Sequence, residues 1–282
     1  MKPDRATEER AADGSAKSRR RRAVRHAGAR LSLTDRDWDL LELVGAARYV
    51  SVRHIALAFF PPGSDRATRR IRALYDAGFL RLTVTSSTEP ALVSLSPDGL
   101  DALWDRLGDE DPRVGLAGAI PLGGVAHHLL LVSARLWAAG LAEVGKPRLL
   151  SWNSGSSEAA VAALGGAKVR PDSMAEFLLS SGNVMTAFVE GDTGTQRQGV
   201  IAGKASRYLP ILTAAPRREL WFATAGSARR EELLAAACRD AGIAGRTRII
   251  GADVLHRRPC EVPARVDGSG APSATRPKDS VP

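Results

Sequence analysis

The run VMTAFVEGDTGTQRQGVIAGKASRYLPIL, residues 184–212, begins as an apolar segment that ends in Glu190 and Asp192 and continues into a segment with helical spacing. The first part predicts a strand and the second part predicts a helix. Side chains on a strand repeat with a period of two, so Glu190 and Asp192 should leave the same face. The run therefore predicts an α/β unit with a polar site where the strand ends.

A candidate catalytic site forms if Asp172, beside another short apolar run, lies on a neighbouring strand. Asp172, Glu190 and Asp192 could then share one divalent cation, and we expect Mg²⁺ or Mn²⁺ as the cofactor. Lys204, on the following helix, could stabilise the developing negative charge. Three carboxylates and a lysine are typical of a metal-dependent phosphodiesterase, in which the metal activates a water molecule.

The same residues also fit roles in folding alone. Asp172 could shape a turn, Asp192 could cap the following helix, and Lys204 could be an ion-pair partner of Glu190. The histidines at 127–128 could approach the site from an earlier helix, although such histidines more often lie in the core or cap a helix. Both interpretations therefore stay open at this point.

Residues 125–252 have the pattern of an α/β domain with a mixed sheet covered by helices. The segment before it, 108–124, combines acidic residues, prolines and glycines, which is typical of a linker. Helices are expected at 127–140, 195–212 and 228–241, and strands at 148–152, 175–179, 184–190, 220–224 and 248–250.

Residues 31–107 predict a winged helix-turn-helix domain. Thr34 and Ser51 are suitable N-caps, and Gly45 is expected to end the first helix. The helices are expected at 34–45, 51–60, 64–78 and 96–107, and the two strands of the wing at 79–84 and 91–95. The chain as a whole thus belongs to the α+β class.

The third helix of this domain is the one that would enter the major groove of DNA. It carries four arginines, which we expect to contact DNA: Arg66, Arg69, Arg70 and Arg72. The alternatives are that they form a solvated helix face, or that the domain docks onto another protein.

The charge of the chain favours a polyanionic partner, with 40 Lys and Arg against 31 Asp and Glu and a net charge of +9. Residues 1–30 contain ten Lys or Arg and four Asp or Glu, so 10 − 4 = +6 of this charge lies there. They contain few apolar residues, which predicts a disordered basic arm. Residues 253–282 are expected to form a disordered tail.

The expected location is the cytoplasm. The basic run is not followed by an apolar core, so we expect no secretory signal. No segment is apolar enough to predict a membrane span. Cys238 and Cys260 indicate neither a disulfide framework nor a zinc site.

Several motifs, taken in order, resemble the replication-relaxation family of actinobacterial and other Gram-positive plasmids and mobile elements. They are Leu33-Thr34-x-Arg36-Asp37, His128-Leu129-Leu130, Arg170-Pro171-Asp172, Glu190-x-Asp192-x-Gly194-Thr195 and Lys204-x-x-x-Tyr208. The second domain also resembles the PD-(D/E)xK nuclease fold. Asp192 stands where that signature has its lysine, so Lys204 would have to supply the charge.

The resemblance implies a protein that binds double-stranded DNA and acts in replication or DNA relaxation, with replication or relaxation proteins as further partners. It could be a Mg²⁺-dependent nicking endonuclease. The alternatives are an inactive replication accessory or transcriptional regulator, and a winged-helix adaptor for other proteins. Phosphate-loop and Gly-x-Ser-x-Gly motifs are absent from the sequence. The oligomeric state is not predicted.

Overall fold

The computed structural model describes residues 31–84, 91–107, 124–141 and 147–257. The expectations for the basic arm, the turn of the wing, most of the linker, Cys260 and the end of the tail lie outside these residues. None of the described helices is long and apolar enough to cross a membrane.

The N-terminal unit consists of helices around a three-stranded antiparallel sheet with the order β1-β3-β2. Its elements are α2 (Asp35–Ala47), β1 (Tyr49–Ser51), α3 (Val52–Phe59), α4 (Arg66–Asp76), β2 (Leu80–Thr83), β3 (Leu92–Leu95) and α5 (Pro97–Leu107). All the predicted helices and both strands of the hairpin are present. The short strand β1, which pairs with β3, was not predicted.

Local sequence signals account for the helix starts. Thr34 and Asp37 form a reciprocal capping box on α2, and Ser51 and His54 form one on α3. The prediction that Gly45 ends the first helix was wrong, because α2 continues to Ala47. A Cβ at Gly45 would lie 3.0 Å from Leu103, so the glycine allows α5 to pack closely.

The C-terminal unit contains a five-stranded sheet with the order β4-β5-β6-β7-β8. Its elements are α6 (Val125–Gly140), β4 (Arg148–Ser154), α7 (Glu158–Leu164), β5 (Ser173–Leu178), β6 (Val184–Asp192), α8 (Gln198–Thr213), β7 (Arg218–Thr224), α9 (Ala228–Asp240), η2 (Ala244–Arg246), β8 (Thr247–Ile250) and α10 (Ala252–Leu255). Strands β4 to β6 are antiparallel, and β6, β7 and β8 are parallel. The predicted mixed sheet is confirmed.

Two short α-helices and the 3-10 helix η2 were not predicted. Helix α7 buries Ala160 and Leu164, and α10 buries Leu255. The prediction that residues 253–255 belong to a disordered tail was therefore wrong, since Leu255 joins the core beside α6.

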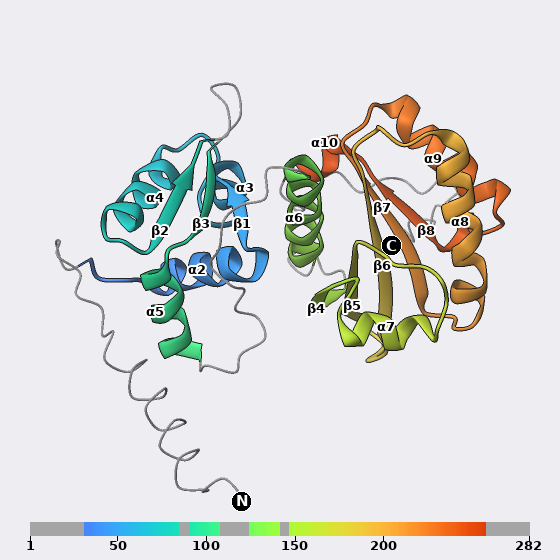
Figure 1. Ribbon diagram of the computed structural model, residues 1–282, viewed down its shortest axis with the longest axis horizontal. Coiled ribbons are helices and arrows are strands. Elements are labelled where there is room, and N and C mark those ends of the chain that lie inside the picture. Colours follow the sequence, from blue (N-terminus) through green and yellow to red (C-terminus); the bar gives the residue numbers. More distant parts are fainter. Residues whose placement is uncertain (1–30, 85–90, 108–123, 142–146, 258–282) are drawn as a thin grey trace, which may run out of the picture.

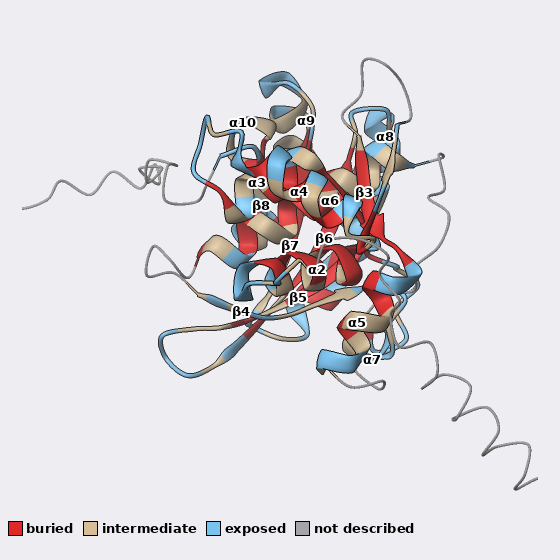
Figure 2. Ribbon diagram, turned by 90° about the vertical axis from the view of Figure 1, so that its left-hand side faces the viewer, coloured by how far each residue is buried: buried red, intermediate tan, exposed pale blue. Residues whose placement is uncertain are grey.

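The sheet separates two apolar layers (Figure 1). Helices α8 and α9 cover one face, in the same apolar cluster as Phe188 of β6, and α6 and α10 cover the other, in the same cluster as Val189. The change of face between these adjacent residues follows the period of two. Figure 2 shows the buried residues concentrated along the strands and the adjoining helix faces.

Helix α6 also joins the two units, between which it lies in Figure 1. Val132 belongs to the core of the N-terminal unit, whereas Leu130 and Trp137 belong to the core against the sheet. Ser133 Oγ lies 2.8 Å from Nε2 of His54 in α3. Helix α6 therefore fixes the second unit against the first.

Candidate functional site

The candidate site lies where β5 begins and β6 runs past it. Strand β5 starts at Ser173, which pairs with Val189, whereas β6 continues to Asp192. Gly191 thus lies beyond the start of β5, and its N–H has no partner in the backbone of that strand. It donates instead to Asp172 Oδ2 at 2.8 Å, so the carboxylate of Asp172 extends the pairing of the sheet.

Asp172 also contacts α6 through His127, whose Nε2 lies 3.0 Å from Asp172 Oδ2. This approach depends on Gly191, because a Cβ there would lie 2.8 Å from Nε2 of His127. The bond to Asp172 raises the pKa of His127. Burial acts to raise the pKa of Asp172, but the bonds from His127 and Gly191 outweigh it and lower that pKa.

Glu190 points to the opposite helix layer and is 0% exposed. The hydroxyl of Tyr208 in α8 donates to Glu190 Oε1 at 2.6 Å. Lys204 Nζ lies 2.5 Å from Oε2 in an ion pair. Burial raises the pKa of Glu190 to about 7 even though the positive charge of Lys204 opposes the shift.

Asp192 leaves the same face as Glu190, as the strand period predicts, but it has another partner. Arg230 of α9 donates from Nε to Oδ2 and from Nη2 to Oδ1, both at 2.7 Å. Thr224 Oγ1 donates to Oδ2 at 3.1 Å. Burial acts to raise the pKa of Asp192, but the bonds from Arg230 outweigh it and lower that pKa.

Each of the three carboxylates thus attaches a different helix to the end of the sheet. Asp172 holds α6 through His127, Glu190 holds α8, and Asp192 holds α9. We name these three pairs the carboxylate anchors. Of the two interpretations left open for Lys204, the structure shows the ion pair with Glu190, and Tyr208 bonds to the same carboxylate.

The structure does not bring the three carboxylates together around one cation position. Within the part of the chain that it describes, no three His, Cys, Asp or Glu side chains are placed to hold a metal ion. Asp192 cannot be a ligand in this arrangement, because Arg230 occupies both its oxygens. Asp192 does not cap α8 either, since the N-cap is Arg197 and has no side-chain capping bond. Metal binding by Asp172 and Glu190 stays a prediction.

Sequence reasoning missed Arg230 because it lies 38 residues after its partner. An arginine on a later helix carries no local signal that identifies its carboxylate. His127 was considered only as one possible residue of the site. The glycine at position 191 of the strand, which lies against His127 in the fold, was the signal that a side chain approaches β6 closely.

Helix α4 presents the other predicted site. Ala67, Ile71 and Leu74 are buried, whereas Arg66 and Arg69 are exposed on the opposite side. The other two predicted arginines have partners. Arg72 lies over the ring of Tyr75, with its carbon Cζ 5.4 Å from the centroid, and its Nε is 3.0 Å from Asp76 Oδ1.

Arg70 requires a correction, because it folds onto α2. Its Nε donates to Asp37 Oδ1 at 2.7 Å and its Nη2 to Oδ2 at 2.5 Å, while Asp37 is 0% exposed. The bonds to Asp37 raise the pKa of Arg70. Burial acts to raise the pKa of Asp37, but the bonds from Arg70 and Thr34 outweigh it and lower that pKa. Arg70 therefore stabilises the N-terminal unit, and helical spacing did not reveal this.

The sequence model of one family, replication-relaxation, matches residues 41–219, well over half of the chain. The chain belongs to the replication-relaxation family. The match runs from α2 to the start of β7, so it includes α4 and the carboxylates of all three anchors but not Arg230. No curated protein and no solved structure matches the chain.

Proposed function

We propose that this replication-relaxation protein binds double-stranded DNA and acts in the replication or relaxation of a plasmid or mobile element. The observation that carries the proposal is α4, which is buried along one side and exposes Arg66 and Arg69 along the other. Exposed guanidinium groups on one helix face match the phosphates that border a major groove.

The order of elements supports a winged helix as the docking module. Helix α4 is the third helix of the N-terminal unit, and the hairpin of β2 and β3 follows it as a wing. The +6 charge of residues 1–30 adds attraction to a polyanion, whatever sequence is bound.

For the second unit, we propose a scaffold that descends from a nuclease fold and works without cutting DNA. The order of α6, three antiparallel strands, α8 and the parallel strand β7 is similar to that of PD-(D/E)xK nucleases. The donor set does not fit a shared Mg²⁺ or Mn²⁺ ion, because Lys204 and Arg230 already neutralise Glu190 and Asp192. No catalytic step is therefore derived through a metal.

One observation keeps nicking as the second candidate function. Asp172 uses a single oxygen, Oδ2, for both of its hydrogen bonds, and its side chain is 26% exposed. Its negative charge also contributes to the raised pKa of Glu190, after the larger effect of burial. Metal-dependent conversion of supercoiled plasmid, abolished by Asp172→Asn, would establish this function in place of the scaffold.

The test of DNA docking is the affinity for a duplex measured as a function of salt concentration. Replacing Arg66 and Arg69 by alanine should make the negative slope of log K against log salt shallower by about 1.8, at roughly 0.9 for each lost phosphate contact. A double variant of two exposed α9 arginines, Arg229→Ala with Arg239→Ala, changes the net charge equally and should leave the slope near that of the wild type.

A slope that falls equally in both variants would show that net charge alone attracts the DNA. The absence of any affinity for duplex DNA would favour the adaptor function.

A further inference from the structure

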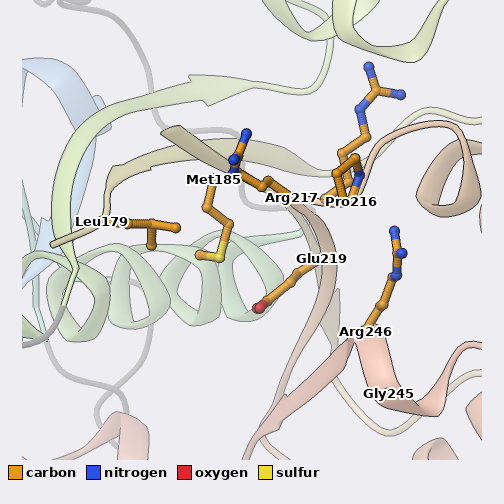
Figure 3. Close-up of a pocket in the computed structure, with 8 residues that line it drawn as sticks. Leu179, Met185, Pro216, Arg217, Glu219, Gly245 and Arg246 are labelled. Carbon is orange, nitrogen blue, oxygen red and sulfur yellow. The ribbon is translucent and has the colours of Figure 1, made fainter. Parts of the chain in front are cut away.

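A hollow of about 260 Å³ lies at the end of the sheet where β7 begins (Figure 3). Arg218 pairs with Thr186 in the strand register, whereas Phe222 pairs with Glu190. At about 3.3 Å per residue, the hollow is about 13 Å along β7 from the carboxylate anchors. It is thus separate from the site described above.

Three guanidinium groups line this hollow, and the fold holds two of them in place. Arg246 donates from Nη1 to the carbonyl oxygen of Ala215 at 2.8 Å and to that of Leu212. Arg218 donates from Nη1 to the carbonyl oxygen of Ile211 at 3.3 Å. These carbonyls belong to the last turn of α8 and the segment after it, so the two arginines also cap that helix.

Capping leaves most of their donors for a ligand. A guanidinium group has five N–H donors, and both side chains bond to the carbonyl oxygens through Nη1. The third arginine, Arg217, is exposed beside them. In Figure 3 the side chain of Arg246 points toward the segment that carries Pro216 and Arg217.

Among the described residues that line the hollow, Glu219 is the one acidic side chain, and it is engaged elsewhere. Glu219 Oε2 accepts the indole N–H of Trp221 at 2.6 Å, and in Figure 3 its carboxyl group points away from Arg246. Three positive charges therefore face the hollow, and a single carboxylate at its border only partly offsets them.

We propose that this hollow binds a phosphate group. Guanidinium groups that are already fixed lose little freedom when they bind an anion, and their planar N–H pairs match two phosphate oxygens. The phosphate could come from a DNA backbone or from a free phosphorylated compound. Neither source depends on α4, so this site binds its ligand whether or not α4 docks onto DNA.

The experiment titrates the full chain with inorganic phosphate, then with pyrophosphate and with a short duplex, and follows binding by calorimetry and by backbone amide shifts. We expect saturable phosphate binding with a Kd of about 1 mM or tighter, and shifts centred on residues 216–219 and 245–246. Arg217→Ala should weaken phosphate binding about tenfold, because it removes one of the three guanidinium groups. Arg217 does not cap α8, so its loss should leave the fold intact.

The matched control is Arg229→Ala, which removes another exposed arginine, from the start of α9. Equal weakening by both variants, or no saturable phosphate binding, would overturn the proposal. If Arg217→Ala also weakens duplex binding, DNA is the source of the phosphate, and if it weakens phosphate binding alone, the source is a free compound. The variant Arg66→Ala with Arg69→Ala should keep full phosphate affinity, which separates this proposal from DNA docking by α4.

Discussion

Helix α4 and the carboxyl end of β6 both carry clustered charges, but the structure uses them differently. On α4, Arg66 and Arg69 project into solvent. At the end of β6, each acidic side chain meets a cation from a different helix, as with Asp192 and Arg230. Charges that remain exposed can bind a partner, whereas charges that are buried and paired mainly determine how the chain packs.

The same contrast divides α4 itself. Arg69 and Arg70 are adjacent in the sequence, yet only Arg70 bonds to the buried Asp37. Membership of a basic cluster therefore does not identify a DNA contact. What distinguishes these two arginines is the presence of a carboxylate within reach on the neighbouring helix.

The largest effect should come from removing the cation of one carboxylate anchor. Arg230→Ala leaves Asp192 buried and unpaired, so we expect the free energy of unfolding to fall by about 3–5 kcal/mol. Denaturant titration measures this change, and Arg229→Ala should stay within about 0.5 kcal/mol of the wild type. A loss below about 1 kcal/mol in Arg230→Ala would mean that Asp192 is not held by this pair.

The junction between the two units should be sensitive to acid. His54 Nδ1 lies 3.2 Å from the N–H of Ser51, which can only donate, so the ring is neutral in the fold. Burial lowers the pKa of His54 to about 4, and the nearby basic groups His256, Arg53 and His128 lower it further.

As the pH falls below about 6.5, His54 is therefore protonated in the unfolded chain before it is protonated in the folded one. Stability should be lost between there and pH 4, by up to about 3 kcal/mol. The control, His54→Gln, does not titrate and should show a flatter dependence on pH in thermal unfolding. An equal slope in both proteins would rule out His54 as the cause.

A smaller effect should follow from adding one methyl group at Gly191, beside the anchor that Asp172 forms with His127. In Gly191→Ala the new Cβ meets Nε2 of His127 at 2.8 Å, so we expect a loss of about 1–3 kcal/mol in the free energy of unfolding. His127→Ala removes the obstacle, so the double variant should lose less than the two single losses combined. Strict additivity of the two would contradict the contact.

The smallest effect should come from Glu190→Gln. The pKa of Glu190 is raised, so its contribution to stability is present below pH 4.5 and is lost as the pH rises through about 7. Above that pH the glutamine variant, which Tyr208 can still bond, should equal or exceed the wild type by up to about 1 kcal/mol. A loss of more than about 2 kcal/mol at pH 8 would show that the ion pair with Lys204 is strongly stabilising.

The sequence predicted what periodicity and local capping determine. The strand predicted at 184–190, which continues to Asp192, the helix carrying Lys204, and the caps at Thr34 and Ser51 are all in place. The pairing of Glu190 with Lys204 was one of the two interpretations that the sequence left open.

The partners that the sequence did not reveal are distant in sequence. Asp192 was assigned to a metal because Arg230 comes 38 residues later, and Arg70 was assigned to DNA because Asp37 comes 33 residues earlier. Neither pairing leaves a periodic signal. Helix α7 was missed because Glu158–Leu164 is short and rich in alanine, and its helical start depends on the N-cap Ser157.

The comparison of Arg69→Ala with Arg70→Ala tests most directly whether exposed arginines bind DNA and paired arginines stabilise the fold. For each variant, duplex affinity would be measured together with the free energy of unfolding, at a temperature at which both are folded. Arg69→Ala should weaken binding about three- to tenfold with unchanged stability, and Arg70→Ala should lose about 2–4 kcal/mol of stability with unchanged affinity of the folded protein. Equal losses of affinity in the two variants, with no loss of stability in Arg70→Ala, would contradict the account.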